Sequence, residues 1–391
     1  MIKRLKVSNF LSLKDIDLEF GPRNVLIGPN MSGKSNLIDC FKFLEELLTQ
    51  PAAQTSLWTA LSKRGGFDEI LWKGASERRV TFELTVELSA NGKSARSTRY
   101  DYRVSISDIN NISYLDIDEE TLTSNSTGSV QTILEANRKE TRIDLGDGRI
   151  NQTQGKLNQQ SALWSVPPTS ECGRFRDFVL RWRFYNLIPA LMREGNVPEP
   201  EAKLDAQGTN LSSWLLTLQL YPDFERIKQV CRDVLPDLAE MLFQPNPSKN
   251  ISVSTRERYF EGNFPISRMS DGELAFAALM SLILAPKKLT PPLLCIEEPE
   301  NYLHPKLLET VVEVLNQRAL ELGSGASQII ATTHSPYLVD KLNLEDLVVA
   351  EKEKGATKFT RPSTKKKLRD LLSRREMGLG ELWFSGALSD T

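Results

Sequence analysis

The sequence predicts an α/β fold with a mixed sheet, N-terminal antiparallel strands and an inserted helical lobe. Residues 2–10 and 16–20 alternate apolar and polar side chains, as half-buried strands do. A short apolar strand at 25–27 is followed by a glycine-containing loop and by a helical pattern over 34–48. After residue 250, strand and helix patterns alternate, which favours parallel strands flanked by helices.

The composition is that of a soluble globular protein. Of the 391 residues, 40% are hydrophobic and 26% are charged, which excludes a disordered or membrane-embedded chain. No apolar run approaches the roughly 20 residues that span a bilayer, and no signal-peptide core is present, so we expect a cytoplasmic protein. Four widely spaced cysteines indicate neither a disulfide framework nor a zinc knuckle. The net charge of −2 predicts no general attraction to DNA.

The length favours two or three structural units, and the composition divides the chain into residues 1–106, 107–263 and 264–391. The second part begins with a stretch rich in Asn, Ser, Thr, Gln and Gly, which predicts an irregular insertion up to about residue 170. Large apolar residues at helical spacing over 175–193 and 211–234 then predict the helical lobe. The remaining predicted elements are strands at 80–88, 100–106, 251–260, 293–296 and 328–332, and helices at 274–284, 306–322 and, basic in character, 365–375.

Residues 28–35 read Gly-Pro-Asn-Met-Ser-Gly-Lys-Ser and fit the phosphate-binding pattern G-x-x-x-x-G-K-[ST] between a predicted strand and helix. The backbone N–H groups of such a loop and the positive end of its helix bind phosphates. Lys34 would reach the β- and γ-phosphates of ATP, and Ser35 would bind Mg²⁺. The alternative, a chance glycine turn, is disfavoured by the flanking strand and helix. The nucleotide-binding residues that we expect here are Asn30, Ser32, Gly33, Lys34, Ser35 and Asn36.

Two carboxylates follow the predicted strand at 293–296. Side chains at this end of a parallel strand, beside a phosphate loop, are placed to meet metal and water. We therefore expect Glu297 to hold Mg²⁺, directly or through water, and Glu298 to polarise the water that attacks the γ-phosphate. A solvated acidic turn is the alternative.

Two further features follow the same logic. Ser270 directly precedes an apolar helix, so it is placed to cap that helix, whose N–H groups could meet an anion. His334 follows the predicted strand at 328–332, where its side chain could hydrogen-bond a γ-phosphate. Taken alone, the first is a helix cap and the second a structural histidine.

In their order along the chain, the four features resemble the head of an ABC-type ATPase, and more narrowly the branch shared by SMC, RecF and OLD-type proteins. The resemblance covers residues 1–50 and 264–340 and implies a P-loop NTPase fold of the ABC-ATPase type, with the first and third parts of the chain forming the head. It makes residues 28–35 the Walker A motif, 270–273 the signature, 296–298 the end of Walker B, 300–304 the D-loop, and His334 the switch histidine. It implies ATP and Mg²⁺ as ligands, Lys34, Glu298 and His334 as catalytic residues, Ser35 and Glu297 as metal ligands, and Ser270, Gly272 and Glu273 as nucleotide contacts.

The sequence departs from the family pattern in three places. Glu297 stands where these ATPases more often have Asp. Asp271 and Glu273 replace Gly and Gln of the signature. No glutamine of the Q-loop is identified, although Trp72 and Lys73 lie near its expected place.

The resemblance also implies a homodimer, or a higher oligomer, in which each signature serine contacts the γ-phosphate bound by the other head. The segment between Walker A and the signature lacks the sustained heptads of an SMC coiled coil. The 57 residues after His334 are too few for the Toprim nuclease domain of OLD-type proteins. We therefore expect a stand-alone head.

Such a head resembles the small ATPases that sense or regulate a separate effector, for example a nuclease, in prokaryotic antiviral defence. The segment 379–386 is similar to the ending of such ATPases. Two alternatives remain. One is a RecF-like DNA-repair clamp, in which basic residues of the 365–375 stretch contact DNA phosphates. The other is a non-hydrolysing switch that uses nucleotide only to set assembly.

Overall fold

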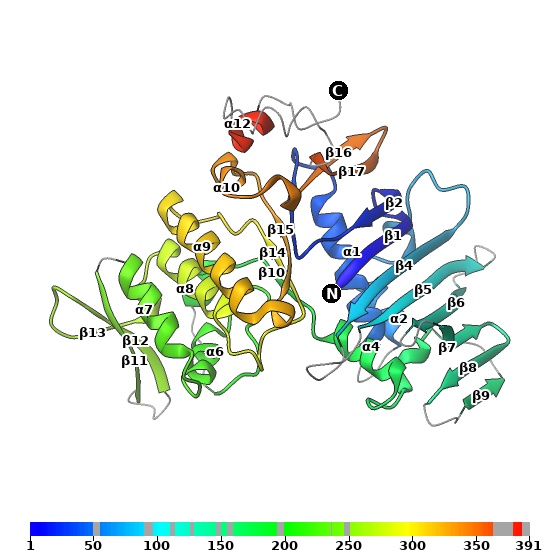
Figure 1. Ribbon diagram of the computed structural model, residues 1–391, viewed down its shortest axis with the longest axis horizontal. Helices are drawn as coiled ribbons and strands as arrows, with labels where there is room; N and C mark the ends of the chain where they lie inside the picture. Colours follow the sequence, from blue (N-terminus) through cyan, green and yellow to red (C-terminus); the bar gives the residue numbers. More distant parts are fainter. Residues whose placement is uncertain are drawn as a thin grey trace. The chain divides into compact units, whose positions relative to one another are not determined.

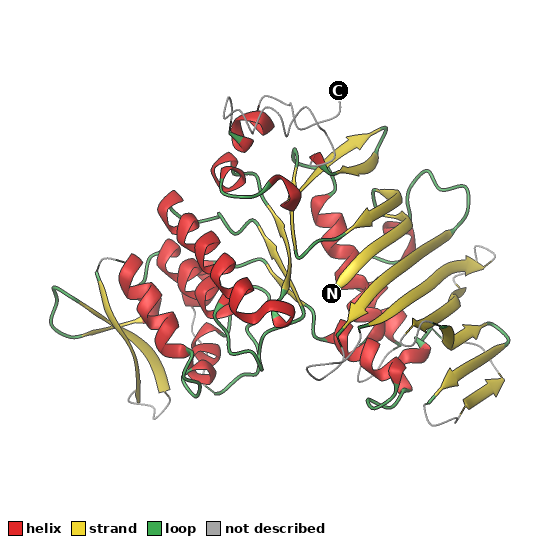
Figure 2. Ribbon diagram, viewed as in Figure 1, coloured by secondary structure: helices red, strands yellow, loops and turns green. Residues whose placement is uncertain are grey.

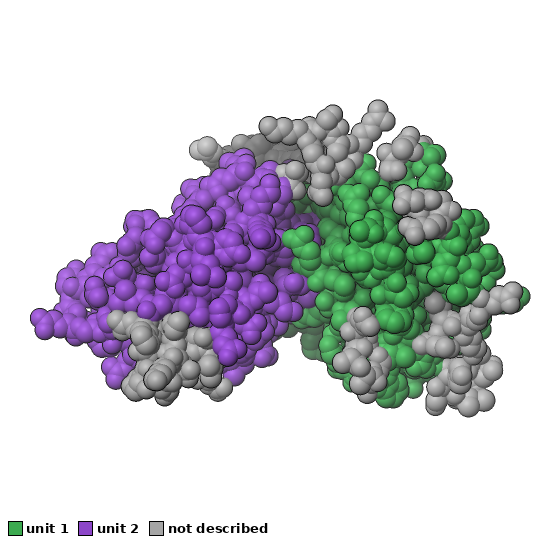
Figure 3. Space-filling model, turned by 90° about the horizontal axis from the view of Figure 1, so that it is seen from below, with its two compact units in different colours: residues 1–182, 348–361 green, residues 183–347, 362–391 purple. Residues whose placement is uncertain are grey.

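A computed structural model describes the chain in eleven segments. They are residues 1–49, 55–89, 97–109, 114–125, 129–145, 150–154, 159–193, 199–235, 237–245, 251–362 and 378–384. Two compact units are found, Met1–Trp182 with Val348–Arg361 and Arg183–Leu347 with Pro362–Thr391, as Figure 3 shows in two colours. The three-part division drawn from composition stays a prediction, and the basic stretch 365–375 lies outside the described residues. Within the described segments, no helix has the length and apolar character needed to cross a membrane.

The first unit contains an antiparallel sheet of eight strands (Figure 1). Its strands lie in the order β2 (Leu13–Glu19), β1 (Ile2–Phe10), β4 (Arg79–Leu88), β5 (Thr98–Ile109), β6 (Tyr114–Asn125), β7 (Val130–Asn137), β8 (Glu140–Asp144) and β9 (Ile150–Gln154). Alternate residues of β4, including Val80, Phe82 and Leu84, are buried, as expected for a sheet with one covered face. The strand patterns predicted at 2–10 and 80–88 are confirmed.

The irregular insertion predicted up to residue 170 is wrong in part, because β6 to β9 occupy much of that stretch. Polar residues prevail there because side chains alternate between the two faces of a strand and because some of the buried ones, such as Glu120, are polar as well. In β6 and β7 the buried positions include Leu122 and Leu134, which pair across the two strands, while Thr121 and Glu135 point outward. Few apolar residues are needed to cover one face of a sheet, so the alternation of buried and exposed side chains could not be recognised in this polar stretch.

Helices α1 (Lys34–Leu48), α2 (Ser56–Ser62), α3 (Phe67–Ile70) and α4 (Glu171–Leu180) and the short helix η1 (Ala162–Ser165) complete the first unit together with three strands. These strands are β3 (Arg23–Ile27), β16 (Leu347–Glu353) and β17 (Ala356–Thr360), in that order. Helix α1 buries an apolar face in which Phe43 stacks on Phe82 of β4 with ring centroids 5.4 Å apart. The helix predicted at 34–48 is confirmed.

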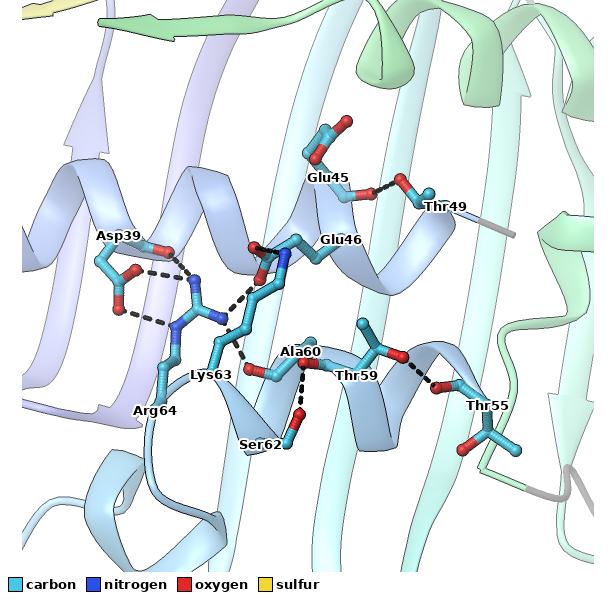
Figure 4. Close-up of polar contacts among 10 residues, drawn as sticks. All are labelled: Asp39, Glu45, Glu46, Thr49, Thr55, Thr59, Ala60, Ser62, Lys63 and Arg64. Atoms are coloured by element: carbon cyan, nitrogen blue, oxygen red, sulfur yellow. Dashed lines mark hydrogen bonds and ion pairs between the residues drawn. The ribbon is translucent and has the colours of Figure 1, made fainter. Parts of the chain in front are cut away.

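The outer side of α1 is tied to the loop that follows α2 (Figure 4). The guanidinium of Arg64 donates to both carboxylate oxygens of Asp39, and its Nη1 donates to Glu46 Oε2 (2.5 Å) and to the Ala60 carbonyl (2.7 Å). The same group lies over the ring of Phe43, 5.2 Å from its centroid. With 10% of its side chain exposed, Arg64 anchors the helix that begins at the phosphate loop.

The second unit holds three parallel strands in the order β10 (Arg183–Tyr185), β14 (Leu293–Glu297) and β15 (Gln328–Thr332). Its helices are α5 (Pro189–Arg193), α6 (Leu211–Leu218), α7 (Phe224–Val234), α8 (Asp271–Ile283), α9 (Pro305–Leu322), α10 (Pro336–Asp340) and α12 (Leu379–Phe384), with short helices η2 (Ile266–Arg268), η3 (Gly323–Gly325) and η4 (Leu344–Asp346). A small antiparallel sheet contains β11 (Leu238–Pro245), β12 (Ile251–Glu257) and β13 (Asn263–Pro265). Figure 2 shows these helices in red and the strands in yellow.

The core of the second unit contains almost all of α8, whose residues 274–283 are buried. Leu294 and Ile296 of β14 and Leu308 and Val311 of α9 belong to the same apolar cluster. Here α8, β14, α9 and β15 match the predicted helices and strands to within three residues at each end.

The helical lobe differs from its prediction in one respect. The stretch 175–193 is divided among α4, β10 and α5, since residues 183–185 pair with β14 instead of continuing a helix. The stretch 211–234 forms α6 and α7, and Pro222 lies between them. Proline cannot donate a helical backbone hydrogen bond, which accounts for the break.

Candidate functional site

The loop between β3 and α1 passes close to the backbone of the β16–β17 hairpin. Gly28 has φ 149° and Gly33 has φ 101°, conformations that residues with a Cβ rarely adopt. A Cβ on Gly28 would lie 2.1 Å from the carbonyl oxygen of Ala350, and one on Gly33 would lie 2.0 Å from Thr357 Oγ1. Both glycines are therefore required by space as well as by backbone conformation.

Helix α1 begins with Gly33 as its N-cap, so no side chain caps it, and its first turn contains no acidic residue. The first turn of a helix leaves N–H groups without intrahelical acceptors and carries a partial positive charge. Together with the turn at Gly28, this end of α1 has the character of a phosphate site.

Lys34 folds back over the loop and is 6% exposed. Its Nζ atom donates to the carbonyl oxygens of Gly28 and Pro29, both at 2.9 Å. Ser32 is buried beside it, and its Oγ atom has no hydrogen-bond partner among the described residues. A cation held over the loop and a buried hydroxyl free to bond both fit the phosphates of a nucleotide.

The phosphate loop is braced by two hydroxyls that the sequence did not single out. Thr357 of β17 donates from Oγ1 to the Ser32 carbonyl (2.9 Å), and Asn36 Nδ2 donates to Ser12 Oγ (2.6 Å). Ser12 Oγ and Thr357 Oγ1 are 2.6 Å apart. Because the one proton of Thr357 is already given to Ser32, Ser12 is the donor in this third bond. No local pattern could have found this chain of bonds, since its members lie 345 residues apart.

In the second unit, Glu298 directly follows β14 in a left-handed conformation with φ 47°. This conformation costs a non-glycine residue roughly 1–2 kcal/mol. The N–H of Glu298 donates to the carbonyl and to Oγ1 of Thr332, both at 3.1 Å. Glu297, the last residue of β14, pairs in register with the same Thr332. The ends of β14 and β15 are thus fastened together.

The carboxylate of Glu298 lies between two side chains. Its Oε2 accepts from Asn301 Nδ2 at 2.9 Å, and its Oε1 lies 3.7 Å from Nε2 of His334. The structure therefore brings together two of the residues predicted to be catalytic. It adds Asn301, which no sequence signal marked beyond its place in the predicted D-loop.

Ser270 caps α8 as the sequence predicted. Its Oγ accepts from the N–H of Glu273 at 3.3 Å, and Glu273 Oε2 accepts from the N–H of Ser270 at 2.7 Å, which makes a capping box. Asp271 pairs with Arg193 Nη1 at 2.5 Å, and Gly272 lies where a Cβ would come within 2.9 Å of the Tyr302 carbonyl.

The other predicted residues take local places. His304 caps α9, with Nδ1 accepting from the N–H of Lys306. The Trp72 N–H donates to the carbonyl of Asn9, and Lys73 donates to the carbonyl of Asp68, so the Q-loop stays unassigned. Asn30 and Ser35 are exposed at the phosphate loop.

Magnesium in phosphate-transfer sites is held by one or two protein oxygens together with substrate phosphates and water. The hydroxyl of Ser35 in the first unit and the carboxylate of Glu297 in the second are oxygen donors of this kind. Their chemistry fits Mg²⁺.

A phosphate loop joined to a helix, and a strand that ends at Glu297 and is followed by Glu298, are features of a P-loop nucleotide-binding fold. The family model described as "AAA domain, putative AbiEii toxin, Type IV TA system" matches residues 23–340, and the chain belongs to this family. The match spans all four motifs predicted from the sequence.

Solved structures of SMC heads are similar to this chain. An SMC head bound to the C-winged helix domain of ScpA has a TM-score of 0.52 at 14% identity, over 92% of this chain and 97% of that one. The SMC head domain from Thermotoga maritima has a TM-score of 0.47 at 15% identity, over 92% and 98%. The first likeness shows the fold, and the predicted ABC-type ATPase fold is confirmed.

Among curated proteins, an OLD nuclease of Thermus scotoductus (strain ATCC 700910 / SA-01) is 50% identical over 38 residues. This segment is 10% of the chain and 7% of the nuclease, so the chain matches only a small part of that relative. With the family match and the SMC-type fold, this short match is consistent with an ABC-type ATPase of the SMC/OLD branch.

Proposed function

We propose that the chain binds ATP with Mg²⁺ and hydrolyses it. The observation that carries this proposal is the Glu298 carboxylate, held between Asn301 and His334 directly after a metal-suited carboxylate. A carboxylate fixed in this way can accept a proton from an attacking water. Family membership as an AAA-type ATPase supports the same reaction.

The assignment of roles follows from these contacts. The loop amides and Lys34 would bind the phosphates, and Ser35 and Glu297 would hold Mg²⁺, which would neutralise charge on the phosphate oxygens. The Oε2 atom of Glu298 accepts from Asn301, so Oε1 on the side of His334 is the oxygen left to take the proton. His334, whose Nε2 lies 3.7 Å from that oxygen, would be the residue to hydrogen-bond the γ-phosphate.

We extend the proposal to a dimer held together by ATP. The Oγ of Ser270 acts as an acceptor in the capping box, which leaves its hydroxyl proton for an acceptor outside the cap, such as a phosphate bound by a second copy. The unusual Asp271 of the signature is paired with Arg193, which offsets a charge that would otherwise repel a phosphate.

The biological role that we propose is control of a separate effector, such as a nuclease, in prokaryotic antiviral defence. The family description names a putative toxin of a type IV toxin–antitoxin system, and the curated relative is named as a nuclease. Affinity purification from the native host tests this role, with Glu298→Gln as bait to favour the ATP-bound form. If neither the wild type nor Glu298→Gln recovers a stable partner, this role is contradicted.

Steady-state hydrolysis tests the enzymatic proposal, comparing the wild type with Glu298→Gln, with and without double-stranded DNA. We expect the substitution to lower kcat by about 100-fold or more while ATP binding and ATP-dependent dimers persist. Glu313→Gln is the matched control, because Glu313 is exposed on α9 in the same unit. Wild-type turnover by Glu298→Gln would show that the assigned role is wrong.

Two other outcomes decide between alternatives. ATP-dependent dimers without turnover of the wild type would replace hydrolysis by a nucleotide-dependent assembly switch. Strong stimulation by DNA would favour the repair clamp, whose predicted DNA contacts in the 365–375 stretch lie outside the described residues.

A further inference from the structure

Glu300 occupies the turn between β14 and α9 and reaches across to the residues that follow β15. Its Oε1 atom accepts two hydrogen bonds, from Thr333 Oγ1 at 2.6 Å and from the backbone N–H of His334 at 2.8 Å. Thr333 is fully buried. One carboxylate oxygen thus fixes both the residue before the switch histidine and the backbone of that histidine.

Further hydrogen bonds connect Thr333 to the residues that follow it. Thr333 Oγ1 also accepts from the N–H of Ser335 at 3.0 Å, and Ser335 Oγ accepts from the N–H of Leu338 as the cap of α10. Residues 333–335 are therefore set between the anchor at Glu300 and the start of a helix. A shift of Glu300 would be passed to His334 at the centre of this loop.

The turn that carries Glu300 also carries the other support of Glu298. Within it, the Asn301 N–H donates to the Glu298 carbonyl and the Leu303 N–H donates to the Glu300 carbonyl, both at 3.0 Å. Asn301 holds Oε2 of Glu298 from inside the turn, while Glu300 holds His334 on the side of Oε1. Both neighbours of the Glu298 carboxylate thus depend on one short turn.

The second oxygen of Glu300, Oε2, is buried and has no hydrogen-bond partner among the described residues. This oxygen therefore takes no part in the two hydrogen bonds that fix the backbone of His334. A side chain that lacks it but keeps Oε1 can still accept both of them.

We propose that Glu300 is a positioning residue, which sets the ring of His334 against the carboxylate of Glu298. This inference rests on the proposed hydrolysis of ATP and deepens it. The hydrogen bonds that fix Glu300 join it to residues of the second unit, whereas the phosphate loop belongs to the first. We therefore expect a change at Glu300 to affect the chemical step more than the binding of phosphates by the loop of the first unit.

Two substitutions separate position from charge. Glu300→Gln keeps the length of the side chain and an oxygen that can accept both hydrogen bonds. Glu300→Asp keeps the charge but is one methylene shorter, so its carboxylate no longer reaches both donors. We expect Glu300→Asp and Glu300→Ala to lower kcat about 10- to 100-fold with KM within about twofold, and Glu300→Gln to retain most of the activity. Equal or better activity of Glu300→Asp than of Glu300→Gln would overturn the inference.

The histidine signals provide a readout that does not depend on turnover. The chain contains only His304 and His334, so NMR of the ring Cε1–H groups gives two signals, which a His304→Gln spectrum assigns. Glu300→Asp should move the His334 signal and leave that of His304 in place, while Glu300→Gln, which keeps both hydrogen bonds, should move the His334 signal less. An unmoved His334 signal in folded Glu300→Asp would overturn the positioning role. A wild type without turnover would instead refute the proposed hydrolysis.

Discussion

His334 Nε2 lies 3.7 Å from Glu298 Oε1, at the ends of two neighbouring parallel strands. The two residues are 36 positions apart in the chain, and each follows directly or closely on an apolar strand. Parallel strands present their carboxyl ends at one edge of a sheet, which is why polar residues from separate motifs converge there. The meeting of these two side chains is the geometric basis for the predictions about turnover above.

Gly33 provides a test of the phosphate loop. Gly33→Ala should abolish measurable ATP binding, because the new Cβ would lie 2.0 Å from Thr357 Oγ1 at the N-terminus of α1. Gly66→Ala is the matched control, since Gly66 has a similar φ of 106° and a Cβ added there would meet nothing within 4 Å. Because ψ of Gly66 is −177°, that control should cost about 1–3 kcal/mol of stability through backbone strain, and it should leave binding unchanged. Equal nucleotide affinity of both variants, measured by calorimetry, would refute the close approach.

Thr357→Val tests the brace on the phosphate loop. The substitution keeps the shape of the side chain but removes the donor to the Ser32 carbonyl and the acceptor for Ser12. We expect the free energy of unfolding to fall by about 1–3 kcal/mol and the affinity for ATP to decrease. Thr360→Val on the same strand is the control, because the Thr360 hydroxyl has no partner among the described residues. Urea denaturation should show that control to be neutral or stabilised.

Arg64 should matter more to stability than its neighbour Lys63. Arg64→Ala leaves Asp39 and Glu46 without their shared cation, and we expect a loss of about 2–4 kcal/mol. Lys63→Ala removes a pair whose lysine side chain is 57% exposed and should cost less than about 1 kcal/mol. Arg64→Lys should recover only part of the loss, because lysine lacks the two-pronged geometry. Similar melting temperatures for the two alanine variants would contradict this ranking.

Glu120 should make the first unit less stable as pH rises. Burial raises the pKa of its carboxyl above the ordinary value, although Ser161, Ala162 and Tyr102 all donate to it. The folded state therefore holds the proton more tightly than the unfolded state. The contribution of Glu120 to stability is fully present below the pKa of the unfolded state and is lost as pH rises through the pKa of the folded state. The stability of the wild type relative to Glu120→Gln, measured in urea from about pH 4 to about pH 8, should decrease over this range. A constant difference would show that the carboxyl does not titrate differently in the two states.

Local patterns predicted the elements that carry the motifs. Strand β15 and helix α1 have the predicted bounds, because a continuous apolar strand and an amphipathic helix are each specified by neighbouring residues. Strand β10 was missed because its three residues lie within a helical pattern and form a strand only by pairing with β14, more than 100 residues later. Pairing over such distances leaves no local signal.

The same limit applies to the site. The residues that bear phosphate-binding and carboxylate chemistry stand in recognisable motifs. The residues that hold them in place do not stand in such motifs. Ser12 and Thr357 meet only in the folded first unit, and Glu300 is recognised only by its hydrogen bond from the backbone of His334. Sequence patterns indicated which residues would react, whereas the residues that hold them in place required the fold.

The hairpin of β16 and β17 also sets an order in time for the nascent chain. The phosphate loop leaves the ribosome first, and the hydroxyl of Thr357 and the backbone of Ala350 that close around it are made more than 300 residues later. Synthesis proceeds at about 5–20 residues per second, so the hairpin that contacts the phosphate loop is made some tens of seconds after the loop itself. A nascent chain therefore completes the surroundings of its phosphate loop only after this hairpin has emerged. The proposed ATP-bound dimer could then form only after the strands and helices of both units that precede the hairpin have been made.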